Sequence, residues 1–116
     1  VSIFQLQSDA NTIDINTPCF PITNLSAIWN NNIVYTNFDE GIFATRCPTN
    51  SKRIFYMWDL DWQNSRYSKE IMNEVINKSD YVFVRDESFI RPIELFFGRI
   101  SDGVNKDFDL EGFCEL

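Results

Sequence analysis

Two aspartates one residue apart, Asp59 and Asp61, are the residues whose type and spacing could support chemistry. They follow an apolar run at residues 54–58. Two carboxylates that leave a strand end on the same side can hold Mg²⁺ or Mn²⁺, because these cations prefer oxygen ligands, and the metal would then bridge to phosphates. The spacing therefore gives a metal hypothesis for Asp59 and Asp61. The alternative is that both residues are turn formers after a strand.

Trp58 and Trp62 flank the aspartates and allow a second interpretation. Flat indole rings beside carboxylates can form a surface on which a sugar stacks, with the carboxylates orienting its hydroxyls. In the alternative interpretation, Trp58 belongs to the core and Trp62 packs under the helix that begins at Ser68.

Polar residues at the ends of three predicted strands extend this candidate site. The carboxyl ends of parallel strands share one edge of a sheet, where α/β proteins bind ligands. Arg85 at this edge would contact an anion. The expected ligand-binding set is Asn37, Trp58, Asp59, Asp61, Trp62, Arg85, Glu87 and Ser88. The alternative is that these polar residues, with Asp39 and Ser68, are helix caps and turn formers.

The elements that must position this set alternate between strands and helices. Short apolar runs predict strands, and Asp39, Ser68 and Ser88 are expected to begin helices, with Gly98 ending one. In chain order we expect a strand at 2–6, an edge strand or ordered loop around 13–15, an extended turn at 18–21, a helix at 25–29, a strand at 33–36, a helix at 41–46, a strand at 54–58, a helix at 68–76, a strand at 81–84, a helix at 88–97, a weak strand at 100–104 and a helix at 110–114 capped by Asp107 or Asp109. This order predicts an α/β fold, a three-layer Rossmann-like domain at residues 1–116 with a mostly parallel sheet of four to five strands.

Composition excludes several functions. A chain of 116 residues is long enough for one domain, and it contains no His, which excludes His-based acid–base catalysis and His-ligated metals. Its net charge of −7 disfavours nucleic acid and anionic membranes as partners. The three Cys are interpreted as buried free thiols in a reducing compartment. No apolar run is long enough to span a membrane and no signal peptide is recognisable, so we expect a cytoplasmic protein, in the host cell if it is viral.

Aromatic residues are unusually frequent, at 16% of the chain with eleven Phe. A small sheet cannot bury so many rings alone, and this motivates the expectation of a homodimer. No glycine-rich phosphate-binding loop is present, which disfavours dinucleotide and nucleoside-triphosphate binding of the familiar kinds.

Several short motifs resemble known proteins. The segments D-Y-V-F-V-R-D-E-S at 80–88 and G-R-I-S-D-G-V-N-K-D-F-D at 98–109 are similar to the later part of the N-terminal Rossmann-like domain of two-domain, GT-B type glycosyltransferases. The motifs P-C-F-P at 18–21, V-Y-T-N at 34–37 and F-Y-M-W-D-L-D-W at 55–62 resemble short uncharacterised proteins of marine tailed phages. The resemblance implies a fold more than an activity. Because GT-B enzymes bind the sugar nucleotide mainly in a second domain, an isolated half would lack the donor site.

These observations lead to two expectations of function. The first is a viral or microbial binding or assembly module, glycosyltransferase-like in fold but not catalytic alone. The alternative is a small protein that handles a sugar or nucleotide sugar through Asp59, Asp61 and Trp62, with Mg²⁺ or Mn²⁺ as the candidate cofactor.

Overall fold

Four parallel strands form the main sheet. The structure is a computed structural model that describes residues 3–5, 19–21, 31–60 and 67–116. Within it, β3 (Asn32–Tyr35), β4 (Lys52–Met57), β5 (Tyr81–Val84) and β6 (Gly103–Val104) lie side by side in chain order, and each pairs in parallel with the next. The predicted α/β fold with a mostly parallel sheet is confirmed.

Helices connect these strands. The connections contain α1 (Phe38–Arg46), α2 (Lys69–Lys78) and the 3₁₀ helix η3 (Glu87–Phe89) followed by α3 (Ile90–Phe97), while α4 (Leu110–Cys114) follows β6. Ser68 caps α2 and Asp109 caps α4, as predicted. Gly98 ends α3 with a left-handed backbone (φ 69°), which glycine adopts without steric cost.

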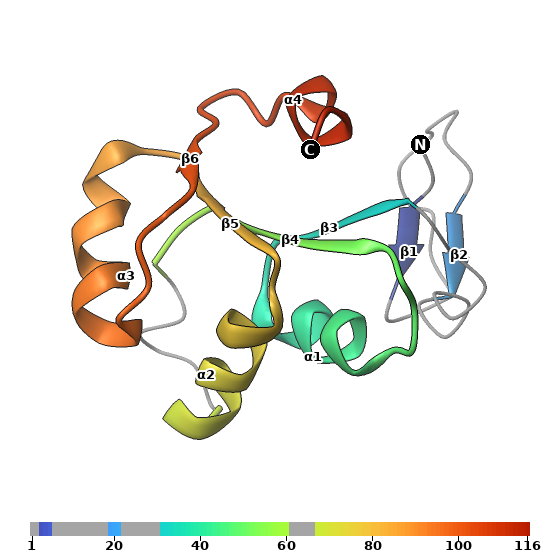
Figure 1. The fold of residues 1–116 in the computed structure, drawn as a ribbon, viewed down its shortest axis with the longest axis horizontal. Helices are drawn as coiled ribbons and strands as arrows, with labels where there is room; N and C mark the ends of the chain where they lie inside the picture. The colour runs from blue at the N-terminus through green and yellow to red at the C-terminus, as the bar shows by residue number, and fades with distance from the viewer. Residues whose placement is uncertain (1–2, 6–18, 22–30, 61–66) are drawn as a thin grey trace.

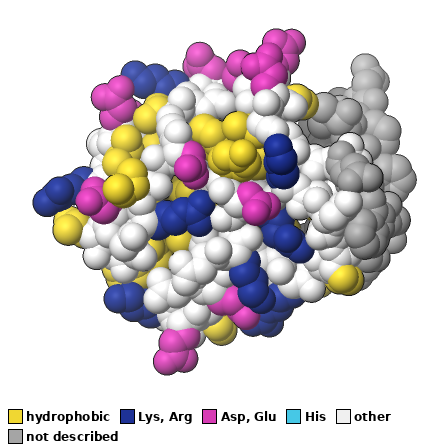
Figure 2. Space-filling model, in the orientation of Figure 1, with side chains coloured by type: hydrophobic (Ala, Val, Ile, Leu, Met, Phe, Trp, Pro, Cys, Tyr) yellow, Lys and Arg dark blue, Asp and Glu magenta, His cyan; other side chains and the backbone are white. Residues whose placement is uncertain are grey.

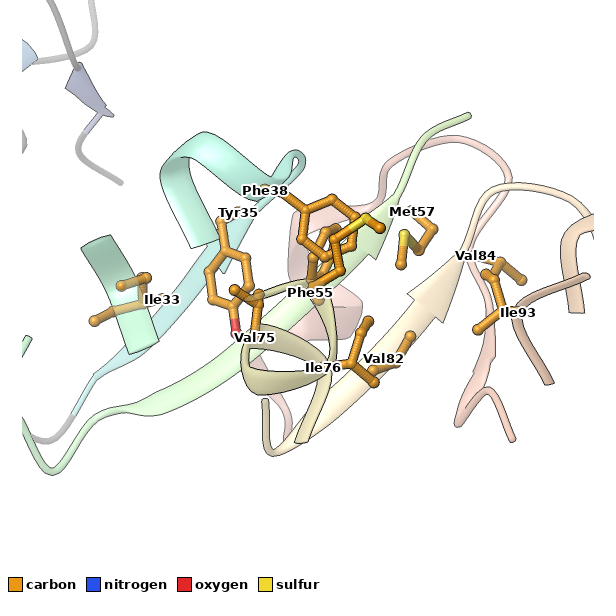
Figure 3. Packing of buried hydrophobic residues seen from close by; sticks show 12 residues of the cluster. Ile33, Tyr35, Phe38, Phe55, Met57, Val75, Ile76, Val82, Val84 and Ile93 are labelled. Carbon is orange, nitrogen blue, oxygen red and sulfur yellow. The ribbon is translucent and has the colours of Figure 1, made fainter. Parts of the chain in front are cut away.

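The two faces of the sheet bury different clusters. Alternate strand residues point to opposite faces, and one set packs with α1, α2 and α3 (Figures 1 and 3). On the other face, the fully buried Ile54 and Tyr56 of β4 pack against Phe113 of α4. Figure 1 shows α1 and α2 on one side of the sheet and α4 on the other. The architecture therefore has three layers, with one five-residue helix on the second face.

The first predicted strand does not join the main sheet. Instead β1 (Ile3–Gln5) pairs in parallel with β2 (Cys19–Pro21) in a separate two-stranded sheet, and the extended turn predicted at 18–21 contains this second strand. The predicted helix at 25–29 and the segment around 13–15 lie outside the described residues.

The cysteines also differ from the prediction. Cys114 is exposed and Cys47 half-buried, and both are free thiols, so burial is wrong for Cys114. The third, Cys19, lies in β2. No helix in the described part of the chain has the length and apolar character needed to cross a membrane.

Two arginines bind the carbonyl groups at helix ends, at the amino edge of the sheet. Arg53 donates to the carbonyl oxygens of Ala44 and Cys47, each at 2.8 Å, at the end of α1. Arg99 donates to the carbonyl oxygen of Ile76 at 2.6 Å, at the end of α2. A cation at a helix C-terminus satisfies carbonyls that have no partner within the helix and complements the helix dipole.

A buried hydroxyl pair joins β3 to the end of α2. The Tyr35 hydroxyl lies 2.5 Å from Oγ of Ser79, and this serine in turn donates to the Val75 carbonyl at 2.7 Å. The serine hydrogen is thus in use, and we infer that Tyr35 is the donor of the shorter bond. Burial raises the pKa of Tyr35 to about 12, because a phenolate there would lose its hydration.

This raised pKa leads to a prediction about alkaline stability. Below pH ~10 Tyr35 is protonated in both the folded and the unfolded chain, so its stabilising contribution is fully present. As the pH rises from 10 towards the folded value of about 12, the unfolded chain loses the proton first, and stability falls by about 1.4 kcal/mol per pH unit. Urea unfolding measured at a series of pH values should show this loss.

Tyr35→Phe provides the control. At neutral pH the variant should lose about 1 kcal/mol, the net contribution of one hydrogen bond. It should also lack the Tyr35 part of the alkaline loss, so the two proteins should become equally stable near pH ~11. A parallel decline of both proteins between pH 10 and 12 would contradict the assignment of this loss to Tyr35.

Candidate functional site

Asn37 follows β3 and is the N-cap of α1. Its side-chain oxygen accepts a hydrogen bond from the Glu40 N–H at 2.9 Å. The prediction that Asp39 caps this helix is wrong, because the helix begins at Phe38 and Asp39 lies in the first turn, where its carboxylate accepts from the Tyr67 hydroxyl. The Asn37 oxygen is therefore engaged by a backbone N–H that has no partner within the helix.

Trp58 and Arg85 meet at the carboxyl edge of the sheet. They follow β4 and β5, and the Arg85 guanidinium carbon lies 4.6 Å from the centre of the Trp58 ring. The same carbon lies 5.9 Å from the Phe89 ring. A guanidinium over an aromatic face is attracted by the ring electrons. The structure therefore brings together two predicted site residues from different strands.

Trp58 is not a core residue. Its side chain is 46% exposed, whereas the preceding four residues of β4 are buried. The interpretation that Trp58 belongs to the core is therefore wrong. The strand ends at Met57, and the indole lies beyond it, 6.2 Å from the Tyr56 ring between ring centres. One indole face is thus occupied by Arg85, while much of the remaining surface is open to solvent.

The next predicted residues form the start of η3. Asp86 is the N-cap: its Oδ1 accepts from the Ser88 N–H at 2.9 Å, and hydrogen bonds from Ser88 lower the Asp86 pKa. The prediction that Ser88 begins a helix as its cap is therefore wrong, since Ser88 lies inside η3. Glu87 and Ser88 are both exposed.

The aspartate pair is only half described. Asp59 is half-buried between Trp58 and Leu60, and Leu60 packs against the core beneath α1, α2 and α3. Asp61 and Trp62 lie outside the described residues, so the paired-carboxylate geometry and the position of Trp62 stay predictions. Among the residues that the structure does describe, no three His, Cys, Asp or Glu side chains are grouped so that they could hold a metal ion.

The strand order bears on what this edge can bind. Open α/β sheets bind ligands in the crevice where the strand order reverses, because neighbouring connections there leave on opposite faces. The four strands of the main sheet follow chain order without a reversal, and α1, α2 and α3 pack in one cluster on one face. The carboxyl edge of these four strands therefore has no reversal of strand order, which is the place where nucleotide-binding crevices form in such sheets.

Two residues at this edge were missed by the sequence interpretation. Phe89 forms the second aromatic contact of Arg85, and Asp86 is the cap of η3. The sequence does indicate that Asp86 is a cap, because an aspartate two residues before a serine can accept a hydrogen bond from the backbone N–H of that serine. No comparable signal identifies Phe89, whose direction depends on the 3₁₀ turn.

The fold and site together define a class of protein, a small α/β domain with a four-stranded all-parallel sheet. Comparison with known proteins adds no particular family: no family model, curated protein or solved structure matches the chain. The resemblance to glycosyltransferases and phage proteins therefore stays a prediction from the sequence motifs.

Proposed function

We propose that this chain is a binding or assembly module that contacts a protein partner and does not catalyse a reaction alone. The observation that carries the proposal is how the polar groups at the carboxyl edge are used. Asn37 and Asp86 accept backbone hydrogen bonds at helix starts, and the Arg85 guanidinium lies on an indole ring. These groups hold the fold together, while large apolar side chains elsewhere lie open to solvent.

The rival proposal is a site for a sugar or nucleotide sugar at the same edge. The half-exposed Trp58 favours it, with the carboxylate of Asp59 next in the chain and the cation of Arg85 on the ring. An indole surface beside a carboxylate suits a pyranose ring, and a guanidinium suits a phosphate. In this proposal Asp59 and Asp61 would also hold Mg²⁺ or Mn²⁺.

A ligand screen separates the two proposals. Thermal unfolding is measured with a panel of UDP- and GDP-sugars, each with and without Mn²⁺. A ligand that binds the folded chain at a concentration of about 100 times its Kd stabilises it by about 2.7 kcal/mol, which is a clear shift in Tm. The proposal of a binding or assembly module predicts no shift in Tm for any member of the panel.

Matched variants assign any shift that does occur. Asp59→Asn and Asp61→Asn keep the side-chain size and remove the charge, while Asp102→Asn is a control on the amino side of β6, where its carboxylate lies near Arg99. A shift that disappears in the first two variants and survives in the third would overturn the module proposal and establish the rival.

A further inference from the structure

The outer surface of α3 and the turn after it is exposed and apolar. Leu95 is 70% exposed, Ile100 69% and Phe96 37%. Hydrophobic side chains gather on the α3 side of the molecule in Figure 2, with charges of both signs among them. We call Leu95, Phe96 and Ile100 the α3 patch. Together these fractions leave roughly 300 Å² of apolar side chain open, which is the lower end of the range of about 300–600 Å² for the largest patch on a monomer, a patch that is often functional.

The charges that border the α3 patch differ from those of the whole chain. The segment that carries the patch, residues 90–102, contains two cations and two anions, whereas the whole chain carries a net charge of −7. They are Arg91 and Glu94 of α3, and Arg99 and Asp102, which flank Ile100 in the sequence and lie 3.6 Å apart. From α2, Lys69 adds a cation whose amino group lies 5.0 Å from the Phe96 ring centre. The border is thus close to neutral on a strongly acidic protein.

This charge distribution bears on which partner fits. A two-fold contact places one surface against the same surface of a second copy, so a patch with a single sign of charge would repel itself. A border with both signs can instead place an exposed cation such as Arg91 beside a carboxylate of the partner. Two copies of this acidic chain therefore meet with least repulsion at a surface such as the α3 patch.

We propose that the α3 patch is the contact through which two copies of this chain form a dimer about a two-fold axis. The inference rests on the proposed binding or assembly function and names the partner. A standard interface buries about 800 Å² on each partner. The patch supplies the apolar centre of such an interface and the charged border supplies its rim, so we expect a dimer that dissociates on dilution.

Sedimentation velocity across a range of concentrations tests this. From about 1 μM to about 1 mM, where small interfaces associate, the mass should rise from 13.6 kDa towards twice that value. Leu95→Glu and Ile100→Glu should each weaken association at least tenfold. Because both side chains are mostly exposed, neither variant should lower the Tm of the monomer, measured at about 1 μM. Leu110→Glu, on the exposed surface of α4, should leave association unchanged.

A second measurement locates the contact. Backbone amide spectra recorded on dilution should change mainly at residues 91–100. A monomer at every concentration would overturn the dimer and leave the module proposal to the ligand screen. Association that is equally weakened by Leu110→Glu, or unaffected by both patch variants, would place the contact elsewhere and overturn the α3 assignment.

Discussion

Replacing Phe113 with alanine is expected to lower the free energy of unfolding by about 3–5 kcal/mol. Phe113 is the buried residue of α4, and its ring lies 5.7 Å from that of Tyr56 and 5.4 Å from that of Phe83, between ring centres. A helix of five residues cannot persist in water without packing. Losing this ring should therefore release α4 from the sheet and expose Tyr56.

The segment before α4 is held in its conformation by the same aromatic packing around Tyr56 and Phe113. Phe108 has a left-handed backbone (φ 51°), which a residue with a large side chain rarely adopts. Its ring packs edge to face on Tyr56 at 4.9 Å and lies 5.9 Å from Phe113. Asn105 fixes the same segment, because it accepts the Asp109 N–H at 2.8 Å and donates to the Asp109 carbonyl at 3.0 Å. The aromatic cluster holds Phe108 in this conformation.

Urea unfolding followed by tyrosine and tryptophan fluorescence measures the Phe113 effect. Leu110→Ala is the matched control, since Leu110 lies on the exposed surface of the same helix, and its loss should cost less than about 1 kcal/mol. Equal destabilisation by the two variants would mean that α4 does not act as the cover of the second sheet face.

The sequence predicted the main sheet because its signals are local. The apolar runs at the central strands and the polar segments between them require only a residue and its neighbours. The first strand is present as predicted at Ile3–Gln5, but its separate sheet was not predictable, because strand pairing is not a local property. Its partner Cys19–Pro21 contains a proline, which favours a turn over a strand. The helix start at Phe38 was missed because Asn37 and Asp39 can both cap, and the choice depends on where β3 ends.

The site was predictable to the extent that it depends on topology. Residues that follow parallel strands must share an edge, and Trp58 and Arg85 do meet there. The exposure of Trp58 was not predictable, because five consecutive apolar residues are typical of a strand buried on both faces. Whether Trp58, the last residue of this run, is covered depends on α4, whose residue Phe113 packs on Tyr56 from a distant part of the chain.

Gly41 is the position at which a substitution should most disturb the packing of α1 on α2. A Cβ atom there would lie 2.8 Å from Cγ1 of Val75 and 3.3 Å from the ring of Tyr35. Val75 is fully buried within α2, where a β-branched side chain has one strongly preferred rotamer, so its methyl group cannot turn away at low cost. Gly41→Leu should therefore destabilise the protein by about 3 kcal/mol through overpacking.

Helix propensity alone predicts that replacing Gly41 with alanine stabilises the protein, the opposite of the effect expected from overpacking. Alanine is favoured over glycine inside a helix by about 1 kcal/mol, so Gly41→Ala should still be destabilising if the close approach of α1 to α2 dominates. Gly112→Ala is the matched control, because a Cβ in α4 would meet its nearest neighbour, the side-chain nitrogen of Asn105, at an ordinary 3.8 Å. Chemical unfolding should show Gly112→Ala neutral or stabilised by up to ~1 kcal/mol, and stabilisation by Gly41→Ala would show that α1 can move away from Val75.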